Sequence, residues 1–167
     1  FVPGNEISIF GTPDPVSLKT IKDALSVQME YRYFPVREVE LKSDIHYETL
    51  REGQEVQVGG FTLTTIFMNH PVLTFGYKVE NAGRTFFFTG DHEKYQNIYA
   101  PEDDDYEEYE KLVQEKHQNI VNFIKDVDVM VADSQYTTEE YATKVGWGHS
   151  TFDMCVDLAK DAGVPCM

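Results

Sequence analysis

The sequence contains few cysteines and no long apolar run, and both absences narrow the class of protein. Its only cysteines, Cys155 and Cys166, are too few for a disulfide framework, and their spacing is not that of a zinc site. We therefore expect a reducing, cytoplasmic setting, with both thiols buried as small apolar groups. No apolar stretch approaches the roughly 18 residues that a membrane-spanning helix needs, so we expect no membrane partner.

Basic residues are also scarce. The chain has 14 lysines and arginines against 29 aspartates and glutamates, which gives a net charge of −15. This charge argues against loose binding to nucleic acids, because their phosphate backbones would be repelled. A single phosphate ester in a metal-lined pocket remains compatible with it, since the local charge of a pocket can differ from the sum over the chain.

The order of apolar and polar residues predicts a mixed α/β fold. Alternating or apolar runs predict strands at residues 6–11, 44–50, 54–68 with a turn at Gly59-Gly60, 74–80, 85–90 and 127–133. Helices are expected after Asp14, which can act as an N-cap before Pro15, over much of residues 101–126, and from Ser150 or Thr151 onward. The apolar run at 85–90, "TFFFTG", predicts a strand that is covered on both faces.

Three of the expected strands end in residues that can bind metals. His70, Asp91 and Asp133 each follow such a strand, where α/β proteins commonly place their sites. Imidazole and carboxylate groups together form the ligand sets of zinc, manganese and iron hydrolases. Taken singly, each residue has a simpler interpretation as a hydrogen-bonded turn residue.

A fourth candidate, His149, stands in the segment "GWGHST" (146–151). Helix capping needs only the hydroxyl residues that follow it, whereas an imidazole beside a helix N-terminus suits a site for an anion such as phosphate. Trp147 fits either a pocket wall or ordinary packing, and His92 fits either the site or the surface. The remaining histidines, His46 and His117, are expected to be structural or solvated.

Two long segments, 69–93 and 127–164, resemble the metallo-β-lactamase superfamily. The resemblance rests on His-x-x-x-x-Phe-Gly-Tyr (70–77), Thr-Gly-Asp (89–91) and Gly-His-Ser-Thr (148–151), in that order. The most similar branch contains ribonuclease Z and the cyclic-nucleotide phosphodiesterases. This resemblance implies a partial αββα sandwich, in which mixed sheets are flanked by helices.

The resemblance also implies roles for individual residues. His70 corresponds to a metal ligand, and Asp91 to the aspartate that bridges two metals. His149 corresponds to a catalytic histidine that assists the phosphate or the leaving group, and Asp133 to its acidic partner. Two divalent metal ions are thus implied, with zinc favoured over manganese or iron. A phosphodiester, either a small molecule or a nucleotide, is the implied substrate, while a thioester or lactone stays open.

The chain departs from the family pattern at two points. The His-x-His-x-Asp-His motif, which supplies most metal ligands in this family, is absent from it, and so is the last metal-binding histidine. We therefore expect residues 1–167 to be the central and C-terminal part of a single metallo-β-lactamase-like domain. The alternative is a truncated or degenerate, non-catalytic module for binding or assembly. Unpaired sheet edges also lead us to expect a homodimer.

Overall fold

The computed structural model describes residues 2–167, which divide into two compact units, one up to Arg51 and the other Glu52–Met167. In the first unit, β1 (Glu6–Gly11) pairs in parallel with β2 (Asp44–Thr49). Between them lie α1 (Ile21–Gln28) and a short 3₁₀ helix (Glu38–Glu40). Because each unit is compact by itself, the expectation of a single domain stays a prediction.

The helix α1 begins at Ile21 rather than just after Asp14, so the predicted start is wrong. The carboxylate of Asp14 accepts hydrogen bonds from the N–H groups two and three residues further on, which closes a local turn. Leu18 then has a φ of 58°, which is incompatible with a continuous right-handed helix. Thr20 caps the helix instead, in a capping box with Asp23.

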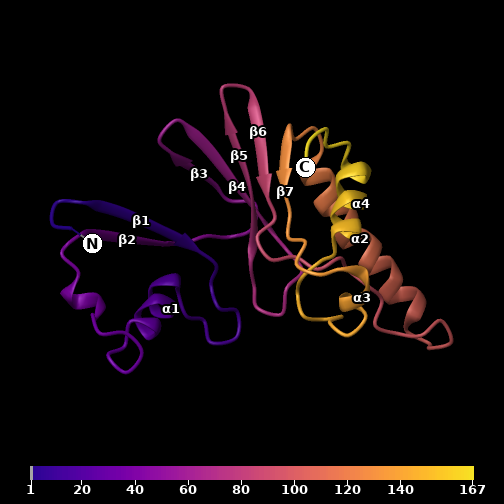
Figure 1. Ribbon diagram of the computed structural model, residues 1–167, viewed down its shortest axis with the longest axis horizontal. Coiled ribbons are helices and arrows are strands. Elements are labelled where there is room, and N and C mark those ends of the chain that lie inside the picture. Colours follow the sequence, from indigo (N-terminus) through magenta and orange to yellow (C-terminus); the bar gives the residue numbers. More distant parts are fainter. Residues whose placement is uncertain (1) are drawn as a thin grey trace. The chain divides into compact units, whose positions relative to one another are not determined.

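The second unit is built on a five-stranded sheet with the order β3-β4-β5-β6-β7 (Figure 1). These strands are β3 (Glu55–Val58), β4 (Phe61–Phe67), β5 (Phe75–Asn81), β6 (Arg84–Phe88) and β7 (Val129–Val131). The helices are α2 (Tyr106–Ile124), α3 (Thr138–Tyr141) and α4 (Phe152–Ala162). Mixed strand directions together with helices confirm the predicted α/β class.

The core of the second unit lies between the sheet and the helices α2 and α4. Phe87 and Met130 point from the sheet into the same apolar cluster as Ile124 of α2. Phe86 and Phe88 alternate with Phe87 and are 37% and 44% exposed, so the prediction of a strand covered on both faces is wrong. Among the described residues, no helix is both long and apolar enough to cross a membrane.

The helix α4 shows that only one cysteine behaves as expected. Thr151 caps this helix by accepting a hydrogen bond from the N–H of Met154, and Gly163 ends it with a φ of 69°. Cys155 is buried on its inner face, as predicted, whereas Cys166 is exposed beyond its end. The prediction that both thiols are buried is therefore wrong for the second one.

The strand directions bring the predicted site residues to one edge of the sheet. The strand β4 is antiparallel to β5, which is antiparallel to β6, and β7 is parallel to β6. The carboxyl ends of β4, β6 and β7 therefore meet at the same edge. His70, Asp91 and Asp133 follow these three strands.

Candidate metal centre

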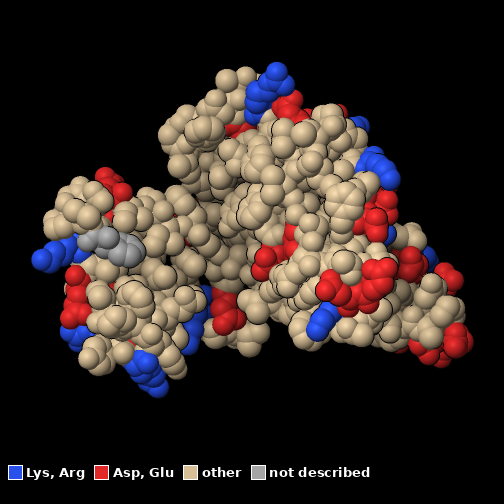
Figure 2. All heavy atoms as spheres, viewed as in Figure 1, with Lys and Arg blue, Asp and Glu red and all other residues tan. Residues whose placement is uncertain are grey.

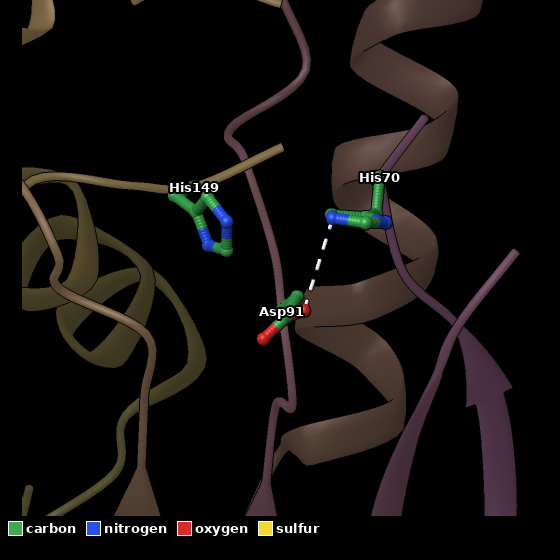
Figure 3. A group of neighbouring side chains, drawn as sticks. All are labelled: His70, Asp91 and His149. Atoms are coloured by element: carbon green, nitrogen blue, oxygen red, sulfur yellow. Dashed lines mark ion pairs between the residues drawn. The ribbon is translucent and has the colours of Figure 1, made fainter. Parts of the chain in front are cut away.

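Three of the predicted residues form a cluster in the second unit, as Figure 3 shows. His70, Asp91 and His149 each offer one ligand atom, and these atoms all lie within 4.8 Å of one another. The Nε2 atom of His70 is 3.8 Å from Oδ2 of Asp91. The two imidazole rings meet edge to face, with their centroids 5.6 Å apart. Residues separated by up to 79 positions in the sequence are thus brought together.

The ring of His70 is fixed by its own loop. Its Nδ1 atom lies 2.7 Å from the carbonyl oxygen of Val72 and 3.2 Å from the backbone nitrogen of the same residue. The shorter contact is that of an Nδ1–H group that donates to the carbonyl oxygen. That tautomer leaves the lone pair of Nε2 facing Asp91. Gly148 lies so close to the ring that a Cβ atom there would be 2.2 Å from Cδ2 of His70.

The ring of His149 is fixed by Asp133. The Nδ1 atom of His149 lies 2.6 Å from Oδ2 of Asp133, and both side chains are largely buried. The same oxygen accepts a hydrogen bond from the backbone N–H of His92, at 3.1 Å. The backbone N–H of Asp133 donates to Oγ1 of Thr89, at 3.0 Å. The Oδ2 atom of Asp133 is therefore fixed by the N–H of His92 and its backbone by Thr89, and Nε2 of His149 is left free for the cluster.

This donor set fits a divalent metal ion such as zinc. Metal-binding histidines characteristically donate their second ring N–H to a carboxylate or a carbonyl oxygen, which orients the ring and raises its basicity. His70 and His149 have such acceptors in Val72 and Asp133. The part of the chain that the structure describes offers one group of three ligands, so a second ion would need ligands from outside it.

His92 lies behind this cluster rather than within it. Its side chain is buried, and its Nδ1 atom accepts a hydrogen bond from the N–H of Asn69, at 3.2 Å. Burial lowers the pKa of His92 from 6.5 to about 4, so the ring is neutral at physiological pH. Of the two interpretations left open by the sequence, the surface position is wrong.

Two further residues border the cluster. Trp147 is 57% exposed, with Nζ of Lys144 at 4.1 Å from its ring centroid, so its ring lies outside the buried core. Glu93 was not among the predicted site residues, yet it is only 4% exposed and accepts hydrogen bonds from Gly146 and Gly148. The only sequence signal for Glu93 is its position two residues after Asp91.

Comparisons with known proteins agree with this architecture. Residues 17–167 match the family model described as the beta-lactamase superfamily domain. The metallo-beta-lactamase fold protein YhfI from Bacillus subtilis is similar in structure, with a TM-score of 0.61 and 16% sequence identity, over 95% of this chain and 49% of that chain. Human tRNase Z, short form (ELAC1), is similar with a TM-score of 0.55 and 16% identity, over 94% of this chain and 56% of that chain.

At such low identity, the two structural likenesses establish the fold alone. The chain spans about half the length of each of these two proteins. No match was found among curated protein sequences. The family match nevertheless extends over most of the chain and confirms the resemblance seen in the sequence. The chain belongs to the β-lactamase superfamily domain family.

Proposed function

We propose that the protein to which this chain belongs is a metal-dependent hydrolase that cleaves phosphodiesters. The observation that carries this proposal is the convergence of His70, Asp91 and His149 at one sheet edge, with Asp133 bonded to the second ring nitrogen of His149. The imidazole of His70 and the carboxylate of Asp91 suit a divalent ion, and His149, with its carboxylate partner Asp133, suits proton transfer.

His70 and Asp91 are proposed to hold metal, with zinc favoured over manganese or iron and a pair of ions in the whole protein. When bound, the metal would supply an activated water and stabilise negative charge on the phosphoryl group. His149 would use its free Nε2 atom to donate a proton or a hydrogen bond to a phosphoryl or leaving-group oxygen. Asp133 would keep the ring in this orientation and stabilise its positive charge.

The charge of the chain favours a small phosphodiester, such as a nucleotide, over a long nucleic acid. One of the similar structures is named a tRNase, but a net charge of −15 would repel an extended phosphate backbone. Figure 2 shows acidic side chains gathered near the start of α2, where residues 102–105 form a run of four carboxylates. A thioester or lactone carries no negative charge, whereas His149 is proposed to donate to a charged phosphoryl oxygen.

The proposal is tested by hydrolysis of bis(p-nitrophenyl) phosphate in the presence of Zn²⁺ or Mn²⁺, together with metal content by plasma mass spectrometry. His149→Ala should lower turnover by roughly 10²- to 10⁴-fold while metal content stays unchanged. His46→Ala is the matched control, because His46 lies half-exposed on β2 in the first unit and should leave turnover unchanged.

Two other outcomes would each overturn part of the proposal. If His149→Ala loses metal in proportion to activity, His149 is a ligand or a structural residue rather than a proton donor. If the metal-loaded protein hydrolyses no phosphodiester, the alternative of a degenerate, non-catalytic module is supported instead.

A further inference from the structure

We infer that Glu93 is a positioning residue, whose buried carboxylate fixes the loop that carries His149. Three hydrogen-bond donors converge on this carboxylate. The N–H of Gly146 donates to Oε1 at 2.7 Å, and the N–H of Gly148 donates to Oε2 at 2.8 Å. The hydroxyl of Tyr141 also donates to Oε1 and in turn accepts a hydrogen bond from Gln96.

The loop is shaped to receive a carboxylate. Gly146 and Gly148 have φ values of 84° and 90°, a region that glycine adopts without strain and other residues rarely enter. This backbone lets the N–H groups on either side of Trp147 bond to the two oxygens of Glu93. His149 follows directly, so its backbone position depends on the anchoring of Gly148.

The backbone of Glu93 also fixes the loop that carries His70. Its N–H donates to the carbonyl oxygen of Asn69 at 2.9 Å, and its own carbonyl oxygen accepts from Nδ2 of Asn69 at 3.0 Å. Glu93 itself lies two residues after Asp91. One residue thus connects the three loops that supply the cluster, namely those of His70, Asp91 and His149.

The burial of Glu93 makes this anchoring strong. A carboxylate that is 4% exposed must be compensated by hydrogen bonds, and charged acceptors form stronger bonds than neutral ones. A glutamine at this position would keep the size of the side chain, but its NH₂ group cannot accept from an amide N–H. Glu93→Gln should therefore release at least one of the two glycine amides while the rest of the unit stays folded.

The anchoring of the loop is inferred from the hydrogen bonds of Glu93, whereas its effect on turnover rests on the proposed function. The test compares Glu93→Gln with Glu140→Gln, a matched control whose exposed carboxylate only caps α3 through Thr137. Amide hydrogen exchange at Gly146 and Gly148 measures the loop directly. Trp147, the only tryptophan in the sequence, reports the same loop through its fluorescence. Circular dichroism follows the global fold.

We expect Glu93→Gln to raise the exchange rate of Gly146 or Gly148 by roughly tenfold or more, in line with the loss of a bond to a charged group. The Trp147 emission should shift, and phosphodiester turnover should fall with KM unchanged. Glu140→Gln should match the unsubstituted protein in all three readouts. Unchanged amide exchange at Gly146 and Gly148 in Glu93→Gln would overturn the inference. Faster exchange of these amides with normal turnover would also overturn it, provided that His149→Ala inactivates the protein.

A protein inactive before any substitution would instead overturn the proposed function and leave the exchange result as a test of the anchoring. If Glu93→Gln does not fold, Tyr141→Phe replaces it, because this variant removes one donor and keeps the ring. Its Gly146 amide, which shares Oε1 with the lost hydroxyl, should keep slow exchange. Free exchange of both glycine amides in the unsubstituted protein would overturn the inference without any variant.

Discussion

The Nδ1 atom of His149 lies 2.6 Å from Oδ2 of Asp133, and the same oxygen receives the backbone N–H of His92. The contact joins the loop after β7 to the loop before α4, which fixes the direction in which the free Nε2 atom of His149 points. A histidine that only filled space would not need a buried carboxylate on one nitrogen, because burying a charge without a function costs free energy.

Replacement of this carboxylate should therefore impair turnover more than folding. Asp133→Asn keeps the size of the side chain and an acceptor oxygen, but it removes the charge that stabilises a protonated His149. We expect turnover of a phosphodiester to fall by about 10²-fold or more, with metal content unchanged.

The matched control is Asp128→Asn, on the residue that precedes the same strand β7 at its other end. Asp128 bonds to the backbone N–H of Thr85, which is remote from the cluster, so turnover should be unaffected. Equal losses from both variants would indicate a general weakening of β7 and contradict the role assigned to Asp133.

The contact between Gly148 and His70 gives a second prediction. A Cβ atom on residue 148 would lie 2.2 Å from Cδ2 of His70 and 2.6 Å from Cδ of Pro71. Gly148→Ala should therefore displace the His70 ring and weaken Zn²⁺ binding, which is measured by competition with a zinc chelator. Gly146→Ala imposes similar backbone strain of about 1–3 kcal/mol at a φ of 84°, but its Cβ would meet no atom within 4 Å. If both variants lose zinc equally, strain alone explains the effect.

The two cysteines should differ in reactivity. Burial raises the pKa of Cys155 to about 11, and its Sγ–H donates to the carbonyl oxygen of Asp133. At pH 8 this thiol is protonated and covered, so a disulfide reagent such as DTNB should modify Cys166 rapidly and Cys155 only after unfolding. Because the thiolate is the reactive form, Cys155 should gain reactivity only as the pH rises toward 11. Rapid labelling of both thiols in the parent at pH 8, or of Cys155 in the Cys166→Ser variant, would contradict the structure.

We propose that the chain self-associates, and the sheet offers an apolar face for this. Phe86, Phe88, Val129 and Val131 are exposed on neighbouring strands and point away from the core that contains Phe87. Adjacent exposed apolar side chains commonly mark interaction surfaces. Light scattering should give a mass near twice 19.2 kDa, and Phe88→Lys should restore the monomer. Val16→Lys, at an exposed site in the first unit, is the control, and a monodisperse parent monomer would refute self-association.

Much of the fold could be predicted because its signals are local. Runs of apolar residues located the strands, and the hydroxyl residues Ser150 and Thr151 located the start of α4, which Thr151 caps. The start of α1 was missed because the side chain of Asp14 bonds to a turn rather than to a helix, a choice that depends on Leu18 adopting a positive φ. The exposure of Phe86 was missed because an apolar run gives no information on whether a second layer covers the outer face.

Some residues of the site could likewise be predicted from the sequence, whereas Glu93 could not. His70, Asp91, Asp133 and His149 follow strands or precede a helix, and motifs in the sequence locate them. Glu93 could not be identified because its role depends on amides 53 and 55 residues away. No local pattern distinguishes a glutamate that will be buried against such amides from one that faces solvent. Long-range contacts of this kind require the three-dimensional structure.

Binding of a divalent metal by His70 and its neighbours can be measured by Zn²⁺ titration, followed through the nitrogen resonances of the histidine rings. We expect the Nε2 resonance of His70 to shift in a saturable manner, while the rings of His46 and His117, which lie outside the cluster, do not shift. Replacement of Asp91 by Asn should weaken the His70 response. A His70 resonance that does not respond to Zn²⁺, or an equal shift of all five histidines, would show that the cluster is not a specific metal site.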